Sequence, residues 1–415
     1  MHYKENYLYI GIDPHKDFHV AVVLDIWGNW RKKLAVVKLH NRPSAFPGFL
    51  EQVKSYAGKG ETLLFGLEDA HNYGRSLAAF LHDNLQPVKE VNSALTTMQR
   101  KSNPSIHKDD AWDAFCAAEI LRSRLDELPD IKPDDYYWTI RQLVTRRYGL
   151  VKSFGTNKNQ LHVQLALSYP SYTKMFGAVD GMAALKFWDK YPSPKALEGV
   201  TAEGLDKFLR DACRNKRAIN GKAEKILSLV QSDGDTTRDH QDRRDFLVRN
   251  IVKELWHRQE LIAELEKELR EVLKLMELKL ETMPGISTVT AAALVAEIGD
   301  INRFSSADKL ARYAGCAPVS FSSGKKIVNK RSQKQGNRRL NEIFYMMAMG
   351  QLSPDFTKGK RNPVFYAYYQ RKISEGKTKG QALICISRRL VNIVYKMMKY
   401  KMGYVIPELP DNDKV

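Results

Sequence analysis

The chain has 415 residues, 43% hydrophobic and 27% charged, and its 66 Lys and Arg exceed its 48 Asp and Glu. A net charge of +18 favours a polyanionic partner such as nucleic acid, with an anionic membrane surface as the alternative. The sequence contains no run of about 18 apolar residues, which argues against a transmembrane helix, and its start lacks the order of a signal peptide. Its four scattered cysteines suit neither a zinc cluster nor a disulfide framework, so we expect a reduced cytoplasmic protein.

The first third of the chain, residues 1–150, has the pattern of an α/β domain. Apolar runs of strand character occur at 7–13, 18–25, 32–39, 62–68 and 87–92. Helical periodicity follows the fourth run as far as Asp83 and returns at about 110–125. Strands that come first and then alternate with helices are typical of a single α/β domain.

The middle of the chain, residues 151–280, is expected to be helical, and its last part reads as one long helix. Apolar residues recur there every seven positions, with Glu and Lys on the flanks: Leu255, Ile262, Leu269 and Met276. This spacing predicts a coiled coil over about 245–280, which would make the protein at least a dimer if it pairs between subunits. The alternative is an amphipathic helix packed within its own chain.

The remaining part, residues 281–405, is expected to be a mainly α-helical domain and holds most of the excess charge. Residues 281–401 contain 22 Lys and Arg against 7 Asp and Glu. One stretch has seven cations and no carboxylate, and we expect it to form a folded surface that contacts nucleic-acid phosphates. Its cations are Lys325, Lys326, Lys330, Arg331, Lys334, Arg338 and Arg339. The tail, 406–415, is short and polar.

Four carboxylates stand where strands end and a helix begins. Asp13 and Glu68 close apolar strands, and Asp110 and Asp113 open a helix. Residues three apart share one helix face, and strand ends can meet a helix start at one sheet edge. Carboxylates gathered in this way repel each other unless a cation neutralises them, and oxygen ligands suit Mg²⁺ or Mn²⁺. The pattern therefore predicts a metal site suited to phosphoryl transfer.

Each of these carboxylates also has a structural interpretation. Asp13 fits a turn, and Asp110 or Asp113 fits the dipole at a helix N-terminus, whereas an acid such as Glu68 is unusual at the end of a buried strand. Asp109 is expected to face about 100° away from Asp110. No ligand spacing links the nearby histidines, which we expect to be structural or solvent-facing: His15, His19, His71 and His107.

Several sequence blocks together resemble a known family, the DEDD transposases of the insertion-sequence family numbered one hundred and ten, relatives of the Piv DNA invertases and known as bridge-RNA-guided recombinases. The N-terminal blocks IGIDPHKDFHVAVV, GLEDAHNYGRSLAAFL and KDDAWDAFCAAEIL match its RuvC-like, RNase-H-fold domain in order and spacing. The block MPGISTVTAAALVAEIGDINRFSSADKLARYAGCAPVSFSSGK is similar to its second domain, and the blocks KQGNRRLNEIFYMMA and YYQRKISEGKTKGQALICISRRLVNIVYKMMK follow in the family's order. Within the first of these C-terminal blocks, residues 283–299 resemble half of a helix-hairpin-helix, with a plain helix start as the alternative.

The resemblance implies a composite catalytic site. The family's four carboxylates fall on Asp13, Glu68, Asp110 and Asp113, and its serine nucleophile falls on Ser323. Taken alone, the segment FSSGKK is an ordinary loop, in which Ser322 and Ser320 are nearly as good candidates. The resemblance further implies a covalent phosphoserine on DNA, donor and target DNA, a structured guide RNA, a dimer or tetramer, and a bacterial or archaeal cell interior.

Two other functions fit parts of the same pattern. A junction-resolving or other structure-specific endonuclease with a RuvC-like domain would need the carboxylates and a metal-activated water, but not Ser323. A non-catalytic scaffold that binds DNA or RNA would need only the basic surface and would be indifferent to the loss of Asp13.

Overall fold

The computed structural model describes residues 3–30, 36–68, 73–102, 109–131, 135–213, 220–323, 326–332, 336–355, 359–360 and 362–407. At 135, 318–323, 326–332, 354–355 and 359–360 it describes the backbone alone. The chain divides into two compact units, Met1–Trp138 and Thr139–Val415, and each is described by itself. None of the described helices has both the length and the apolar character needed for a bilayer crossing.

The first unit is built on a five-stranded sheet with the order β3-β2-β1-β4-β5. The first three strands pair antiparallel, and β4 and β5 join them in parallel. The expected α/β pattern is confirmed. In chain order the elements are β1 (Tyr7–Pro14), β2 (Phe18–Leu24), β3 (Val36–His40), α1 (Phe46–Lys54), β4 (Thr62–Leu67), α2 (Arg75–Asp83), β5 (Val88–Glu90), α3 (Ser93–Ser102) and α4 (Asp110–Ser123).

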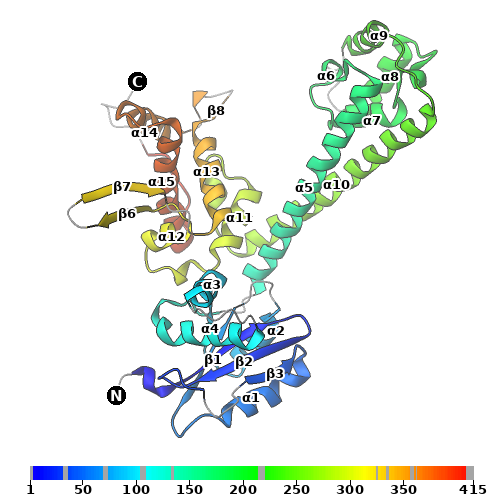
Figure 1. Cartoon of the computed structure of the whole chain (residues 1–415). Helices are drawn as coiled ribbons and strands as arrows, with labels where there is room; N and C mark the ends of the chain where they lie inside the picture. Colours follow the sequence, from blue (N-terminus) through cyan, green and yellow to red (C-terminus); the bar gives the residue numbers. More distant parts are fainter. Residues whose placement is uncertain are drawn as a thin grey trace. The chain divides into compact units, whose positions relative to one another are not determined.

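Helices cover both faces of this sheet (Figure 1). Strand residues such as Ile10 and Ile12 pack against α1 and α2, while the alternate residue Tyr9 faces α4. Side chains on a strand point to opposite faces in turn, so Asp13 lies on the α4 side with Tyr9. The two cores therefore present the end of β1 to the start of α4.

The second unit is mostly helical. The boundary between the units falls at Trp138, within the first turn of the helix at residues 135–168, and the rest of that helix belongs to the second unit. The elements are α5 (Asp135–Ser168), α6 (Tyr172–Met175), α7 (Met182–Lys190), α8 (Ala202–Ala212), α9 (Lys222–Asp233), α10 (Gln241–Leu275), α11 (Thr288–Ile298), α12 (Ala307–Tyr313), β6 (Pro318–Ser323), β7 (Lys326–Ser332), α13 (Arg338–Leu352), β8 (Pro354–Asp355), β9 (Gly359–Lys360), α14 (Pro363–Ser374) and α15 (Lys379–Tyr400).

The long helix expected at 241–280 is α10, which runs alongside α5 (Figure 1). Arg147 of α5 donates two hydrogen bonds to Glu266 of α10, at 2.8 and 2.6 Å. At the other end of this helix pair, Leu255 joins a core around Trp188. The buried apolar residues of α10 thus have partners in their own chain, whereas Phe246, Leu247 and Leu275 of the same helix are exposed.

The last third combines a helix bundle with a two-stranded hairpin. Helices α11 and α15 both pack against α13, and α12 and α14 pack against α15. The hairpin β6–β7 is antiparallel, with Ser323 opposite Lys326. The sequence analysis expected a folded surface in this basic stretch but did not identify the strands, because dense Lys and Arg residues obscure the alternation of apolar residues.

Candidate active site

Two of the predicted carboxylates lie on neighbouring parallel strands. Asp13 is the seventh residue of β1, and Glu68 directly follows β4. Ile12 lies opposite Leu67 in the register, and the Glu68 amide donates to the Ile12 carbonyl at 3.2 Å. Asp13 and Glu68 are therefore at the same level of the sheet, at the carboxyl ends of adjacent strands, where α/β folds place their ligands.

The other two carboxylates come from the first turn of α4, which lies very close to β1. A Cβ added to Gly11 would lie 2.2 Å from both the Ala114 carbonyl oxygen and the Ala118 amide nitrogen. Only glycine allows this contact, which brings the start of α4 to the end of β1. Asp110 and Asp113 are consequently held beside Asp13.

Asp109 differs from its neighbours, as expected. Its side chain accepts a hydrogen bond from the Trp112 amide at 2.6 Å and so caps α4. This capping satisfies one of the free amides at the helix start. Asp109 is a structural residue, and the following acid, Asp110, belongs to the cluster.

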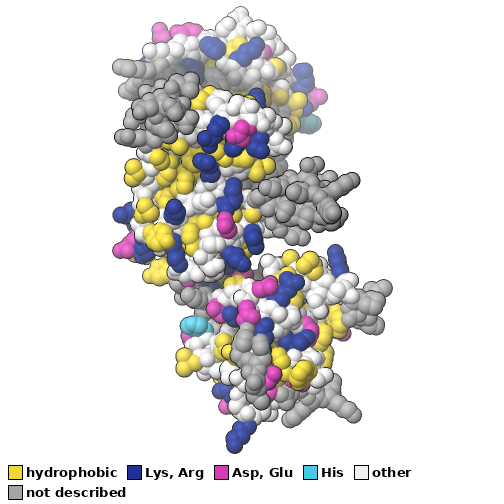
Figure 2. Space-filling view, turned by 90° about the vertical axis from the view of Figure 1, so that its left-hand side faces the viewer, with side chains coloured by type: hydrophobic (Ala, Val, Ile, Leu, Met, Phe, Trp, Pro, Cys, Tyr) yellow, Lys and Arg dark blue, Asp and Glu magenta, His cyan; other side chains and the backbone are white. Residues whose placement is uncertain are grey.

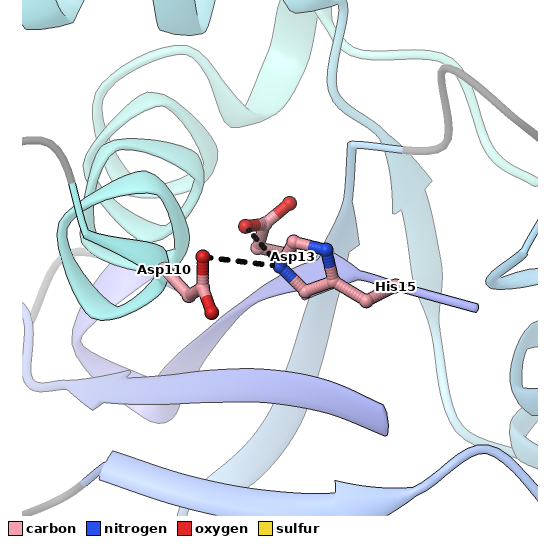
Figure 3. Close-up of side chains that lie close together, drawn as sticks. All are labelled: Asp13, His15 and Asp110. Atoms are coloured by element: carbon pink, nitrogen blue, oxygen red, sulfur yellow. Dashed lines mark ion pairs between the residues drawn. The ribbon is translucent and has the colours of Figure 1, made fainter. Parts of the chain in front are cut away.

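His15 lies between two of the carboxylates (Figure 3). Its Nε2 is 3.1 Å from Asp13 Oδ2 and 3.3 Å from Asp110 Oδ1. One ligand atom from each of the three residues fits within 4.8 Å. The expectation that His15 has no ligand spacing was wrong, because the β1–β2 turn folds it back over Asp13. His19 is buried, and His71 and His107 lie outside the described residues.

A second protein cation, Arg100 of α3, pairs with Asp113. Its Nη1 lies 2.9 and 2.8 Å from the two Asp113 oxygens, and its Nη2 donates to Thr97 Oγ1 at 3.0 Å. The Asp113 side chain is 13% exposed. Burial, followed by the charge of Asp113, raises the pKa of the neighbouring Cys116 thiol to about 11, so this thiol stays protonated.

The surroundings of Asp13 make its ionisation costly. Burial is the largest cause, His15 opposes it, and the charges of Asp113, Glu68 and Asp110 add to it; together they raise the pKa of Asp13 from 3.8 to about 6. All three carboxylates act electrostatically on Asp13, and we call the four the acidic cluster; of them, Asp13 and Asp110 have ligand atoms within 4.8 Å of each other and of His15. Such a pKa marks Asp13 as a candidate functional residue.

The donor set fits a hard divalent cation. Four carboxylates supply the oxygen ligands that Mg²⁺ and Mn²⁺ take, and the imidazole of His15 is acceptable to Mn²⁺. Arg100 already places a positive charge against Asp113, and the His15 ring lies against Asp13 and Asp110. The cluster could therefore hold a metal ion.

The predicted nucleophile lies in the second unit. Ser323 is the last residue of β6, and only its backbone is described; Lys325 and Lys334 lie outside the described residues. The hairpin is tied down at its base, where Asn337 donates from its amide to the Tyr313 carbonyl and from its side chain to Glu297, both at 2.7 Å.

The predicted phosphate-contacting cations are spread over the hairpin and α13. Lys326, Lys330 and Arg331 lie on β7, while Arg338 and Arg339 open α13. Arg339 is committed in part to a structural contact, since its Nη1 lies 3.3 Å from Glu297 Oε1. On the face seen in Figure 2, Lys and Arg side chains are dispersed among hydrophobic ones rather than gathered in one patch.

Comparisons with known proteins agree with this architecture. A family model described as a transposase matches residues 10–170, and one described as the transposase IS116/IS110/IS902 family matches residues 278–370. A protein of insertion element IS116 from Streptomyces clavuligerus is 27% identical over 95% of each chain. The pilin gene-inverting protein of Moraxella bovis is 32% identical over 40% of this chain and 44% of its own.

These matches define the class of protein, which is that of the insertion-sequence transposases. The chain belongs to the IS116/IS110/IS902 transposase family, with a DEDD transposase domain towards its N-terminus and a second transposase domain towards its C-terminus.

Two residues that lie against these carboxylates, His15 and Arg100, were not predicted from the sequence as part of the site. For His15 a signal was present, because a histidine two residues beyond Asp13 in a tight turn can return to the same strand end. Arg100 carried no signal of its own. Thirteen residues separate it from Asp113, and only the packing of α3 on α4 brings the two together.

Proposed function

We propose that this protein is a DNA transposase or site-specific recombinase that cuts and rejoins DNA by metal-assisted phosphoryl transfer, with Ser323 as nucleophile. The observation that carries the proposal is the placement of Asp13 and Glu68 at the ends of adjacent parallel strands, with His15 3.1 Å from Asp13 and 3.3 Å from Asp110 of α4. Membership of a transposase family supports DNA as the substrate. The name of the Moraxella relative, a gene-inverting protein, supports rejoining as well as cutting.

We assign the first unit to the RNase-H-like, RuvC-like fold. Its strand order β3-β2-β1-β4-β5, with three antiparallel strands followed by two parallel ones, supports this assignment. In the second unit we propose separate domains at 151–280 and 281–405. Among the described residues, the core around Trp188 draws only on positions from Phe154 to Trp256, which supports such a division.

The carboxylates Asp13, Glu68, Asp110 and Asp113 would hold Mg²⁺ or Mn²⁺. When bound, such ions neutralise charge that develops on the scissile phosphate and its oxygens. Glu68, Asp110 and Asp113 disfavour the ionised form of Asp13. A bound cation would offset this repulsion, so the carboxylates should have affinity for one.

The Oγ of Ser323 would attack the scissile phosphorus as it loses its proton, and the bond from phosphorus to one deoxyribose oxygen would break. That strand end would leave with a free hydroxyl, while the other would remain joined to Ser323 as a phosphoserine. A serine hydroxyl is a weak nucleophile at neutral pH and needs activation. The ester keeps the energy of the phosphodiester bond, so the exchanged strand can be rejoined without ATP. Lys326, Lys330, Arg331 and Arg338 would contact DNA or RNA phosphates beside it.

The two catalytic parts come from different units and would form a composite site, either within one chain or between subunits. We propose a homo-oligomer, a dimer or tetramer, in which the flanks of α10 contribute to pairing. We also propose a structured guide RNA that pairs with donor and target DNA. The net charge of +18 supports a second polyanion but does not specify RNA.

Ser323→Ala tests the proposed chemistry, with Ser322→Ala as the matched control one residue away. Both proteins would be incubated with Mg²⁺, labelled donor and target DNA, and RNA transcribed from the non-coding flanks of the gene. We expect a detergent-resistant protein–DNA adduct with the wild type and with Ser322→Ala, and neither adduct nor cleavage with Ser323→Ala. Continued cleavage by Ser323→Ala with released ends would instead identify a hydrolytic nuclease.

A further inference from the structure

The contact between Arg100 and Asp113 has the geometry of a cation bound to a carboxylate. A single nitrogen, Nη1, lies almost equally far from both Asp113 oxygens, at 2.9 and 2.8 Å. Equal distances place this nitrogen near the line that bisects the carboxylate. A metal ion that a carboxylate binds with both oxygens lies on the same line. Arg100 and such an ion therefore compete for one position.

Another arginine of the same unit pairs in a different way. Arg122 uses two nitrogens for Glu119, with Nε 3.1 Å from Oε1 and Nη2 2.7 Å from Oε2. This is the parallel fork that Arg and carboxylate groups form in structural ion pairs. The exposure of the two pairs is nearly the same, 27% and 13% for Arg100 and Asp113 against 27% and 15% for Arg122 and Glu119. Their different geometry is therefore not a consequence of solvent access.

The other hydrogen bond that the described residues give the Arg100 side chain is a weaker one, and it supports the guanidinium in its position at Asp113. Its Nη2 donates to Thr97 Oγ1, a neutral hydroxyl one turn earlier on the same helix. The charge of Glu68 acts on Arg100 as well. The guanidinium thus lies among the carboxylates, and its one strong partner is Asp113. A divalent ion that binds Asp113 would displace the guanidinium from it.

We propose that Arg100 is an exchangeable cation: it neutralises Asp113 until a divalent metal binds there, and the released guanidinium then binds a phosphate of the DNA strand. The inference rests on the proposed function, since it requires a metal at the carboxylates. Arg100 keeps its charge when released and is repelled by the incoming ion. A phosphate offers the planar pair of acceptor oxygens that guanidinium groups bind best.

The exchange has two consequences with opposite signs. While Arg100 occupies Asp113, only the remaining fraction of molecules can bind metal there, so the apparent metal affinity is lower by that fraction. An ion pair of about 1.4 kcal/mol would lower it about tenfold. Once metal is bound, Arg100 contributes to DNA binding instead. Loss of Arg100 should therefore strengthen metal binding and weaken DNA binding.

Calorimetric titration of the full chain with Mn²⁺ alone, and then with Mg²⁺ alone, tests the first consequence. We expect Arg100→Gln to bind the metal about tenfold more tightly than wild type, and Arg122→Gln to bind as the wild type does. Thr97→Val, which removes only the second contact of Arg100, should tighten binding about twofold. It also provides a result if Arg100→Gln fails to fold.

The second consequence is measured as DNA affinity at saturating metal. We expect Arg100→Gln to bind DNA about tenfold more weakly than wild type, and Arg122→Gln to bind unchanged. A residue with a purely structural role would weaken both equilibria. Metal affinity that is unchanged or lower in Arg100→Gln overturns the exchange. If instead the wild type binds no metal, or binds it equally after Asp13→Asn, the metal site of the proposed function fails.

Discussion

The acidic edge of the first unit and the basic hairpin of the second differ in how their charges come together. Asp13, Glu68 and Asp113 are far apart in the sequence and meet only because β1, β4 and α4 pack in one way. The hairpin cations, in contrast, follow one another within residues 325–339. The first cluster is a product of the tertiary fold, while the second is present in the sequence itself.

The two groups of charges therefore differ in how much structural support they need. Like charges that must face each other need a rigid support, and the Gly11 contact with α4 provides it. The basic hairpin needs less support, because the nucleic acid that it is proposed to bind carries its negative charges all along the phosphate backbone. Small structural changes should therefore impair the acidic edge severely and the basic hairpin only slightly.

Asp13→Asn should have the largest effect. The variant keeps the shape of the side chain but removes a charge from the centre of the cluster, and we expect strand cleavage to fall at least about a thousandfold. Cleavage of labelled DNA in the presence of Mg²⁺ and guide RNA measures it. Asp109→Asn is the control, since Asn caps helices as well as Asp and should leave cleavage unchanged. Unchanged cleavage after Asp13→Asn would contradict a catalytic role for this carboxylate, whereas a wild type that binds DNA without cleaving it would indicate a scaffold.

Gly11→Ala should have the next largest effect, although it adds a single methyl group. That group would meet the backbone of α4 at 2.2 Å, and we expect β1 and α4 to lose about 3 kcal/mol of local stability. Amide hydrogen exchange in β1 should then be about a hundredfold faster. Gly48→Ala in α1 has open space around the new Cβ and should leave exchange as it is or slow it. Equal effects of the two variants would contradict the support that we assign to Gly11.

Much of the first unit follows from the sequence alone. Apolar runs bounded by turn residues located β1, β2, β4 and β5, and the spacing of Asp110 and Asp113 indicated one helix face. The contacts between elements that are distant in the sequence could not be predicted in this way. The closeness of α4 to β1 depends on Gly11 and Ala114, and neither residue alone predicts a contact.

The second unit was less predictable for a related reason. The seven-residue spacing in α10 correctly indicated a long helix. The same spacing is compatible with packing against a helix of another subunit or of the same chain, so it does not identify the partner. The partner α5 has a weak pattern, because its residues change neighbours along 34 positions. Arg100 shows the same limit in the first unit, since only folding brings it to Asp113.

Metal binding should depend on pH through Asp13. Burial, with the neighbouring carboxylates, raises its pKa from 3.8 to about 6, so the metal-free fold is favoured by protonation and loses stability as pH rises between these values. A bound cation favours the ionised form, so its affinity should increase about tenfold from pH 5 to pH 7. Calorimetry in two buffers of different ionisation enthalpy counts the proton released near pH 6. Asp13→Asn should remove this proton release, and its persistence would assign the release to another group.

The smallest expected effect concerns the basic side of the comparison, where Arg338 and Arg339 are adjacent but differ in their contacts. Arg338 is exposed at the start of α13, whereas Arg339 lies 3.3 Å from the nearly buried Glu297. Arg338→Gln should weaken DNA binding a few-fold and reduce the slope of log affinity against log salt by about 1. Arg339→Gln should leave that slope nearly unchanged and lower stability by about 1 kcal/mol, because Glu297 loses an ionic partner. If both variants reduce the slope equally, the basic stretch acts as an undivided run of charge and the contact with Glu297 does not withhold Arg339 from DNA.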